Sequence, residues 1–322
     1  MKRDKSLIIT LIIILLTVSV SIAYAESPAG NIKDLKGTAK IFRNKEWIEA
    51  KRDKPLYKDD IVRTFEKSRI KMIFVDDSML MLGENSAVSV ADFMKQPGKK
   101  DSSVYKLTEG VVNIIVGKRA FEVHTSTSVS AARGTSFLVW VEPGAEQKTG
   151  LAVTEGRVDF SNAQDPLSLD VIPAGRESYI SKDKPPTAPA RFKQDLIDRY
   201  YEQTLELRER WGPVILSAKG SGVPPPNAVN PVQARLLAER AAKVDALRNL
   251  AEQASGVRIV GNTTISDYIT KSDVIKSQVD TFVKGAWVVS SRQLEDGTVE
   301  VEMELGLGIG FRRMFLEAEG QK

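Results

Sequence analysis

Short apolar runs separated by turn residues fill the chain from Lys36 to Ser181. Residues 137–141 form a run of β-branched and aromatic side chains, and residues 121–125 alternate apolar with polar side chains at period two. Both patterns are typical of β-strands. Because no convincing long helical pattern interrupts them, residues 36–181 predict an all-β domain built as a sandwich, a roll or a short solenoid.

One long amphipathic helix marks a second domain. Asn230 suits the cap of a helix and Pro231 its first position. Apolar residues then recur at spacings of three and four, which predicts a stripe facing a core: Leu237, Ala241, Val244, Leu247, Ala251 and Ala254. A hairpin follows, and residues 299–305 alternate perfectly, so that three glutamates are expected to face water. We expect an α+β domain over 215–310, with one long helix on an antiparallel sheet.

The regions between and after these domains are interpreted as connectors. Residues 182–214 hold a proline-rich linker followed by a helix over 191–211, whose acidic and basic side chains balance. A second connector over 220–226, rich in glycine and proline, precedes the long helix. Residues 311–322 are expected to form a C-terminal tail.

Residues 1–25 have the three-part layout of a secretory signal peptide. A short basic start is followed by an apolar run from Leu7 to Ile22 and by small residues just before Glu26. We expect cleavage before Glu26 and therefore a periplasmic or secreted bacterial protein. The alternative is an uncleaved apolar segment, residues 7–22, that anchors the protein in the inner membrane; only in that case is a membrane a partner.

Side chains that commonly carry chemistry are scarce. The chain has no cysteine and one histidine, His124, which excludes disulfides, thiolate metal sites and multi-histidine metal sites. Its net charge is only +4, which is too small to predict nucleic-acid binding. We therefore expect a protein that is not an enzyme, with no catalytic residues, no metal and no cofactor.

Several motifs of the β-rich region form a set: PLYKDDIVRT at 55–64, FVDDSMLML at 74–82, AARGTSF at 131–137 and VTEGRV at 153–158. In these motifs the region resembles the FecR family, named for the ferric-citrate regulator. Asp59 and Asp77 stand where the family usually has glycine, and aspartate tolerates a turn with positive φ. The resemblance implies a periplasmic module that receives a signal from an envelope partner.

The long helix at 234–252, the residues 285–289 and the final hairpin resemble a different group. They are similar to small outer-membrane lipoproteins of the lipoprotein-20 type, related to the N-terminal domain of flagellar assembly protein T. Those lipoproteins carry a lipobox cysteine, which this chain lacks. The resemblance implies a second, α+β interaction domain without lipid anchoring.

Together these features predict an exported cell-envelope protein that binds an envelope protein or a cell-surface glycan through the FecR-like domain and docks through the second domain. The alternative is a membrane-anchored periplasmic signal-relay protein of the FecR type. It would lack its own sigma-factor-binding segment, because only residues 1–6 precede the apolar run.

The candidate interaction residues are Arg133, Gly134 and Thr135. Glycine permits close approach of a ligand to the backbone and arginine can bind carboxylates, although the same motif also suits a turn between two strands with an exposed arginine. Three tryptophans lie inside strand patterns and are expected in the core rather than on a sugar-stacking surface: Trp47, Trp140 and Trp287.

Overall fold

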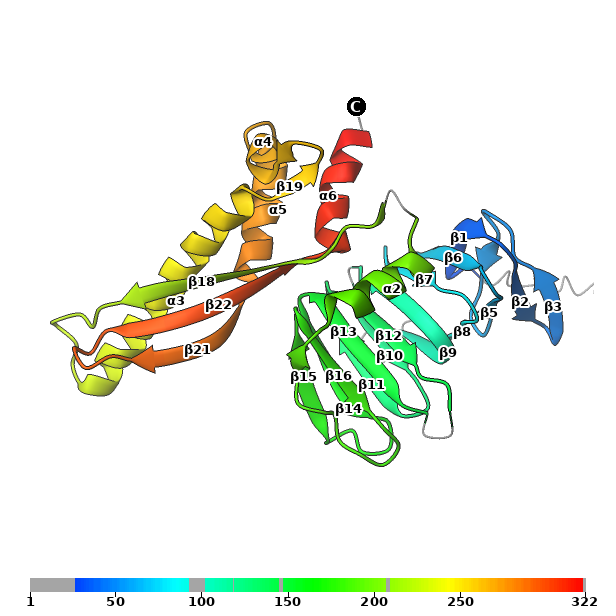
Figure 1. The fold of residues 1–322 in the computed structure, drawn as a ribbon, viewed down its shortest axis with the longest axis horizontal. Coiled ribbons are helices and arrows are strands. Elements are labelled where there is room, and N and C mark those ends of the chain that lie inside the picture. Colours follow the sequence, from blue (N-terminus) through cyan, green and yellow to red (C-terminus); the bar gives the residue numbers. More distant parts are fainter. Residues whose placement is uncertain (1–26, 93–101, 118, 145–146, 207–208, 321–322) are drawn as a thin grey trace, which may run out of the picture.

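A computed structural model describes residues 27–92, 102–117, 119–144, 147–206 and 209–320. Within these ranges the chain forms a β-rich domain followed by an α+β domain, in the order expected from the sequence (Figure 1). The signal peptide predicted over residues 1–25 lies outside the described residues.

The first domain is a β-sandwich of two layers, which we call sheet A and sheet B. Sheet A contains β1 (Gly30–Lys36), β4 (Pro55–Leu56), β6 (Arg69–Phe74), β7 (Met79–Leu82), β12 (Ser136–Val141), β13 (Thr149–Glu155), β16 (Arg176–Ile180) and β17 (Ala190–Arg191). Sheet B contains β2 (Ala39–Arg43), β3 (Glu46–Glu49), β5 (Ile61–Thr64), β8 (Ala87–Asp92), β10 (Ala120–His124), β11 (Ser128–Ala132), β14 (Arg157–Asn162) and β15 (Leu169–Pro173).

Strand β9 (Ser102–Ile115) belongs to both sheets. Its first half pairs with β8 and β10 in sheet B, and its second half pairs with β7 and β12 in sheet A. The strand changes sheets at Gly110, whose φ is 79°, a conformation that favours glycine. Asp59 and Asp77 have φ of 64° and 66°, so both aspartates adopt the left-handed conformation expected from the motif.

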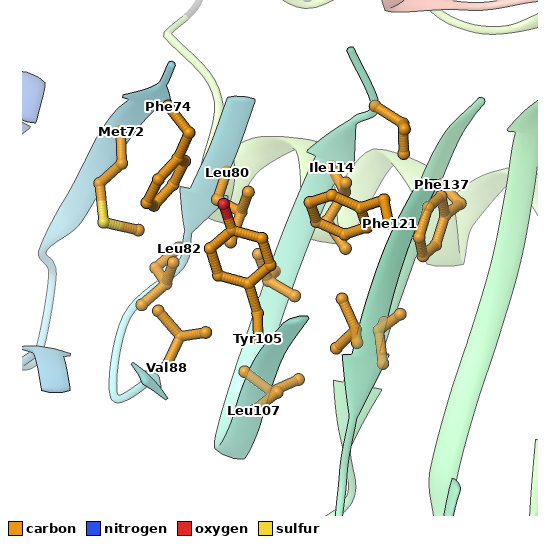
Figure 2. Close-up of a cluster of buried hydrophobic side chains, with 14 of the residues drawn as sticks. Met72, Phe74, Leu80, Leu82, Val88, Tyr105, Leu107, Ile114, Phe121 and Phe137 are labelled. Carbon is orange, nitrogen blue, oxygen red and sulfur yellow. The ribbon is translucent and has the colours of Figure 1, made fainter. Parts of the chain in front are cut away.

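The core of the sandwich lies between the two sheets. Tyr105 of sheet B stacks on Phe121 with ring centroids 4.9 Å apart and meets the edge of Phe74 from sheet A at 4.8 Å (Figure 2). All three side chains are buried. The prediction of an all-β domain is confirmed, and the sandwich is the architecture that forms.

A helix covers the outer face of sheet A. Helix α2 (Gln194–Thr204) is shorter than the helix predicted over 191–211 and buries Ile197 and Tyr201 against β7, β9 and β12. Trp140 of β12 is also buried there, with its ring 4.9 Å from that of Tyr200. The helix is therefore part of the first domain's packing as well as a connection to the second domain.

The second domain has one long helix on a three-stranded antiparallel sheet, as predicted. The sheet order is β18 (Val214–Gly222), β22 (Val299–Leu307), β21 (Trp287–Gln293). Helix α3 (Pro231–Ser255) lies on this sheet, and Asn230 caps it by accepting a hydrogen bond from the backbone N–H of Gln233. The remaining elements are β19 (Arg258–Val260), β20 (Thr263–Thr264), α4 (Ile265–Ile269), α5 (Asp273–Lys284) and α6 (Ile309–Gly320).

The predicted core stripe of the long helix was right only in part: Ala254 is buried and Leu247 and Ala251 are partly buried, whereas Leu237, Ala241 and Val244 are exposed. Val244 is 68% exposed, and the buried side chains of α3 are Ala238, Ala242, Ala246, Leu250 and Ala254. The reason lies on the facing strand β18. A Cβ atom at Gly222 would lie 2.0 Å from the carbonyl oxygen of Ala238, so helix and strand are in backbone contact and only small side chains fit between them.

Two predicted connectors also have a different structure. Residues 220–222 finish strand β18, because their glycines permit the close approach of α3, so the predicted connector over 220–226 is confined to its proline-rich end. Residues 309–320 form helix α6, whose Phe311 and Phe315 are fully buried in the core of the second domain. The predicted C-terminal tail therefore belongs to the domain.

Candidate functional site

A buried carboxylate of the sandwich holds the start of helix α6 in the second domain. Glu155, at the end of β13, is fully buried. Its Oε1 accepts hydrogen bonds from the backbone N–H groups of Gly308 at 2.7 Å and Phe311 at 2.6 Å. Its Oε2 accepts a bond of 2.8 Å from the hydroxyl of Ser136. A side chain of one domain thus caps a helix of the other.

The capping contact requires small residues and perturbs the carboxyl group. A Cβ atom at Gly310 would lie 2.5 Å from Oε2 of Glu155, so any larger residue would displace the carboxylate. Burial raises the pKa of Glu155 to about 7, although the hydrogen bonds from Phe311, Ser136 and Gly308 oppose this rise. Glu155 therefore titrates near neutral pH at the junction of the two domains.

A second buried carboxylate joins the domains from the opposite direction. Glu304 of β22 is 1% exposed and lies 3.0 Å from Nη2 of Arg176 and 2.7 Å from Nη2 of Arg191, both in the sandwich. The alternation of β22 had predicted that Glu304 faces water. This prediction was wrong, because the arginines that bury it come from strands more than a hundred residues earlier in the sequence.

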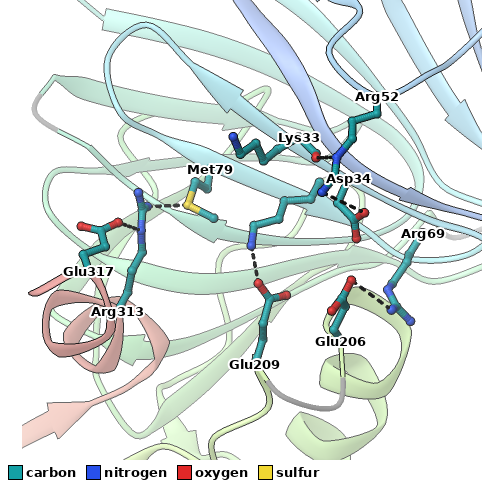
Figure 3. A network of polar contacts seen from close by, with 10 residues as sticks. Lys33, Asp34, Arg52, Arg69, Met79, Glu206, Glu209, Arg313 and Glu317 are labelled. Atoms are coloured by element: carbon teal, nitrogen blue, oxygen red, sulfur yellow. Dashed lines mark hydrogen bonds and ion pairs between the residues drawn. The ribbon is translucent and has the colours of Figure 1, made fainter. Parts of the chain in front are cut away.

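Further polar contacts fasten the linker and α6 to the sandwich (Figure 3). Beyond α2, Glu209 forms an ion pair with Lys71, and Glu206 lies 3.9 Å from Arg69. On α6, Arg313 donates hydrogen bonds to Sδ of Met79 and to Glu317. The junction therefore combines two buried carboxylates with a polar margin.

A cleft of about 1150 Å³ opens beside this junction. The sandwich contributes Asp77, Ile115 and Val116, and the second domain contributes the rest of the lining: Thr263, Tyr268, Lys271, Ser272, Val274, Ile275, Ser277, Gln278, Thr281, Phe282, Gly310, Arg313, Met314 and Glu317. Hydroxyl, amide and charged groups lie there among apolar side chains. Such a surface can bind a ligand through hydrogen bonds and apolar contacts, and both domains are needed to form it.

The predicted interaction residues form the turn between β11 and β12. Arg133 and Gly134 are exposed, and Gly134 has a φ of 58°. The hydroxyl of Thr135 is directed at the carbonyl oxygens of Arg133 at 3.1 Å and Arg157 at 3.2 Å. The carbonyl of Thr135 accepts a hydrogen bond from Val116, which lines the cleft. The motif is thus next to the cleft wall without lining it, and its role in binding stays a prediction.

His124 lies on the outer face of sheet B and does not line the cleft. Its Nε2 is 2.8 Å from Oε2 of Glu122, and this hydrogen bond lowers the pKa of Glu122. Among the described residues, no three histidine, aspartate or glutamate side chains are placed to hold a metal ion. The expectation that the protein has no catalytic residue, metal or cofactor remains a prediction.

The three tryptophans have different environments. Trp140 is buried, as predicted, and Trp287 is half-buried beneath the guanidinium of Arg176, 5.5 Å from its ring centre. Trp47 is 48% exposed on strand β3, so its expected place in the core was wrong. Sequence reasoning also missed both junction carboxylates. The only sequence signal for Glu155 was its place in the motif at 153–158.

Comparison with known families agrees with this architecture. Residues 60–159 match the model of the FecR family, described as FecR protein, and residues 224–306 match the model described as LPP20 lipoprotein. The chain therefore carries a FecR domain followed by an LPP20 domain, as the resemblances predicted. Across the described ranges, every helix is too short or too polar to span a bilayer.

Comparison with whole proteins gives matches among solved structures only. No curated protein matches the chain. Two crystal structures, at 1.65 and 2.50 Å, of a protein from Parabacteroides distasonis ATCC 8503 assigned as an anti-sigma factor are each 11% identical, with a TM-score of 0.37. The first covers 51% of this chain and 68% of its own, and the second covers 74% and 96%.

Proposed function

We propose that the protein is an exported, envelope-associated binding protein that is not an enzyme, and that its FecR and LPP20 domains take an envelope protein in the cleft they share. The two family matches support a place in the cell envelope. The observation that carries the proposal is the composition of the cleft wall, because residues of both domains line one surface.

The junction supports the same proposal. Glu155 and Glu304 each place a buried carboxylate of one domain on donors of the other, which fixes the domains relative to each other. A cleft between rigidly joined domains is ready to bind without the cost of ordering its walls. Val274, which is 68% exposed in this cleft, supplies an apolar contact for a partner.

Crosslinking in intact envelopes followed by co-purification tests the proposal. The test variant is Val274→Asp, and the matched control is Val244→Asp on the outer face of α3, since both valines are 68% exposed on helices. We expect wild type and Val244→Asp to recover the same envelope protein and Val274→Asp to recover at least tenfold less. Recovery of the chain alone, or equal recovery with both variants, would contradict the proposal.

The second candidate is a signal-relay protein of the FecR type that keeps residues 7–22 as an inner-membrane anchor. The FecR match favours it, because a FecR domain of this kind could pass a periplasmic signal to a membrane partner. N-terminal sequencing of the protein isolated from cells separates the two candidates. A chain that starts at Glu26 supports the exported protein, and a chain that starts at Met1 supports the anchored relay.

A further inference from the structure

An aromatic side chain that does not line the cleft is exposed at the edge of sheet B. Trp47 lies on β3, which pairs with β2 and forms the end of the sheet. Its ring packs on that of Phe42, directly across the strand pair, with centroids 5.2 Å apart. Ile61 is the neighbour of Phe42 on β5, so three apolar side chains follow one another across the strands.

A row of charged side chains runs beside this apolar row, two residues away along β3, β2 and β5, and continues to β9. Lys40 lies 3.6 Å from Glu49, and Arg63 lies 2.7 Å from Glu109. The guanidinium of Arg63 is also 6.0 Å from the ring centre of Trp47. We call the two rows together the Trp47 platform: Lys40, Phe42, Trp47, Glu49, Ile61, Arg63 and Glu109.

The charges of the platform decide which ligands it suits. Two cations and two anions are paired with each other, so the platform has no net charge with which to attract an anionic or cationic polymer. Trp47 exposes an apolar area on the order of 100 Å², because an aromatic side chain presents roughly 150–250 Å² and Trp47 is 48% exposed. Stable protein interfaces bury about 800 Å² on each partner, so the platform is too small for one.

A sugar ring fits both rows. The face of an indole ring is electron-rich and attracts the C–H groups on the flat face of a pyranose, which are polarised by the adjacent oxygens. The hydroxyls at the rim of the same ring can then bond to the planar carboxylate and guanidinium groups of the second row. An open, flat platform also admits the middle of a long polymer, which a closed pocket would exclude.

We propose that the Trp47 platform binds the glycan strand of peptidoglycan, whose backbone sugars are uncharged wherever the lactyl carboxyl of muramic acid is amide-linked to a peptide stem. The proposal rests on the envelope location proposed above, but not on binding in the cleft. In this arrangement the FecR domain attaches to the cell wall through sheet B and leaves the cleft open for a protein partner.

Co-sedimentation of the purified protein with isolated peptidoglycan sacculi tests the proposal. We expect wild type to sediment with sacculi and Trp47→Ala to bind at least fivefold more weakly, while Trp47→Phe, which keeps an aromatic face, retains most of the binding. Leu169→Ala is the matched control, because Leu169 is also 48% exposed on sheet B. Arg63→Gln is a second test variant that leaves the aromatic ring in place and should also weaken binding.

The remaining experiments identify the source of the ligand and distinguish glycan binding at the Trp47 platform from protein binding in the cleft. Chitin particles, whose N-acetylated sugars are uncharged and carry no peptide, should also sediment the protein, and Val274→Asp should bind sacculi as wild type does. The proposal is overturned if wild type does not sediment, if Trp47→Ala and Leu169→Ala behave alike, or if the protein binds sacculi but not chitin. Binding to lipopolysaccharide vesicles in place of sacculi would also overturn it.

Discussion

The rest of the chain covers one outer face of the FecR sandwich and leaves the other exposed to water. On sheet A, helix α2 buries Trp140 and its neighbours, and Glu155 at the same sheet holds α6. On sheet B, Trp47 and Leu169 are each 48% exposed, and the charged side chains pair with one another. One face builds the junction, and the other is left open.

Strands of the covered sheet and of the open sheet differ in their sequence patterns. Residues 136–141 of sheet A are an unbroken apolar run after their first serine, and five of the six are buried, since both faces of the strand are covered. Residues 120–124 of sheet B alternate between half-buried and buried positions, since only one face is covered. Continuous runs therefore mark strands with two covered faces, and alternation marks strands with one face in water.

Removing a tryptophan from each face tests the comparison most strongly. Trp140→Ala is expected to lower the free energy of unfolding by about 3–5 kcal/mol, because it leaves a cavity beneath α2. Trp47→Ala is expected to cost at most about 1 kcal/mol, since it loses mainly the contact with Phe42. Urea unfolding followed by circular dichroism measures both values. Equal losses would show that sheet B is covered in solution.

The next largest effect is a pH dependence near neutral pH on the covered face. The ordinary pKa of glutamate is 4.5 and that of buried Glu155 is about 7, so the unfolded chain releases its proton first as the pH rises. The stability contributed by the protonated carboxyl is complete below pH 4.5 and falls between pH 4.5 and about 7. At about 1.4 kcal/mol for each pH unit, the loss is about 3 kcal/mol.

Glu155→Gln isolates this pH dependence. Glutamine keeps an oxygen for the N–H groups of Gly308 and Phe311 and cannot ionise. We expect the variant to match wild type at pH 4.5 and to be more stable at pH 8. Parallel pH profiles of the two proteins, measured by urea unfolding, would refute this assignment.

Local pattern in the sequence predicted the fold class and both domains, because turns, alternation and motifs are local features. It could not predict Glu304, whose burial depends on Arg176 and Arg191 in the other domain. It also could not choose between the two apolar stripes of α3, because the choice depends on Gly220 and Gly222 of the facing strand. The cleft was missed for the same reason, since its walls come from two domains.

The same contrast between covered and open faces exists on helix α3. Ala242→Leu is expected to cost about 1–3 kcal/mol, because the added carbons have no room against the backbone of β18. Val244→Ser, two residues away on the open side, is expected to change stability by less than about 0.5 kcal/mol. Thermal unfolding of the two variants measures the difference, and a larger loss from Val244→Ser would mean that this side of α3 is covered in solution.

The smallest expected effect is the ion pair of Glu122 and His124 on the open face. The bond to His124 lowers the pKa of Glu122, so any stability it adds is present above pH 4.5 and is lost as the pH falls through the lower folded value. Both side chains are more than a third exposed, and water screens the pair. A double-mutant cycle with Glu122→Gln and His124→Gln should therefore give a coupling of at most about 0.5 kcal/mol. A coupling above about 2 kcal/mol would require that something shields this face from water, and the distinction between the two faces of the sandwich would then fail.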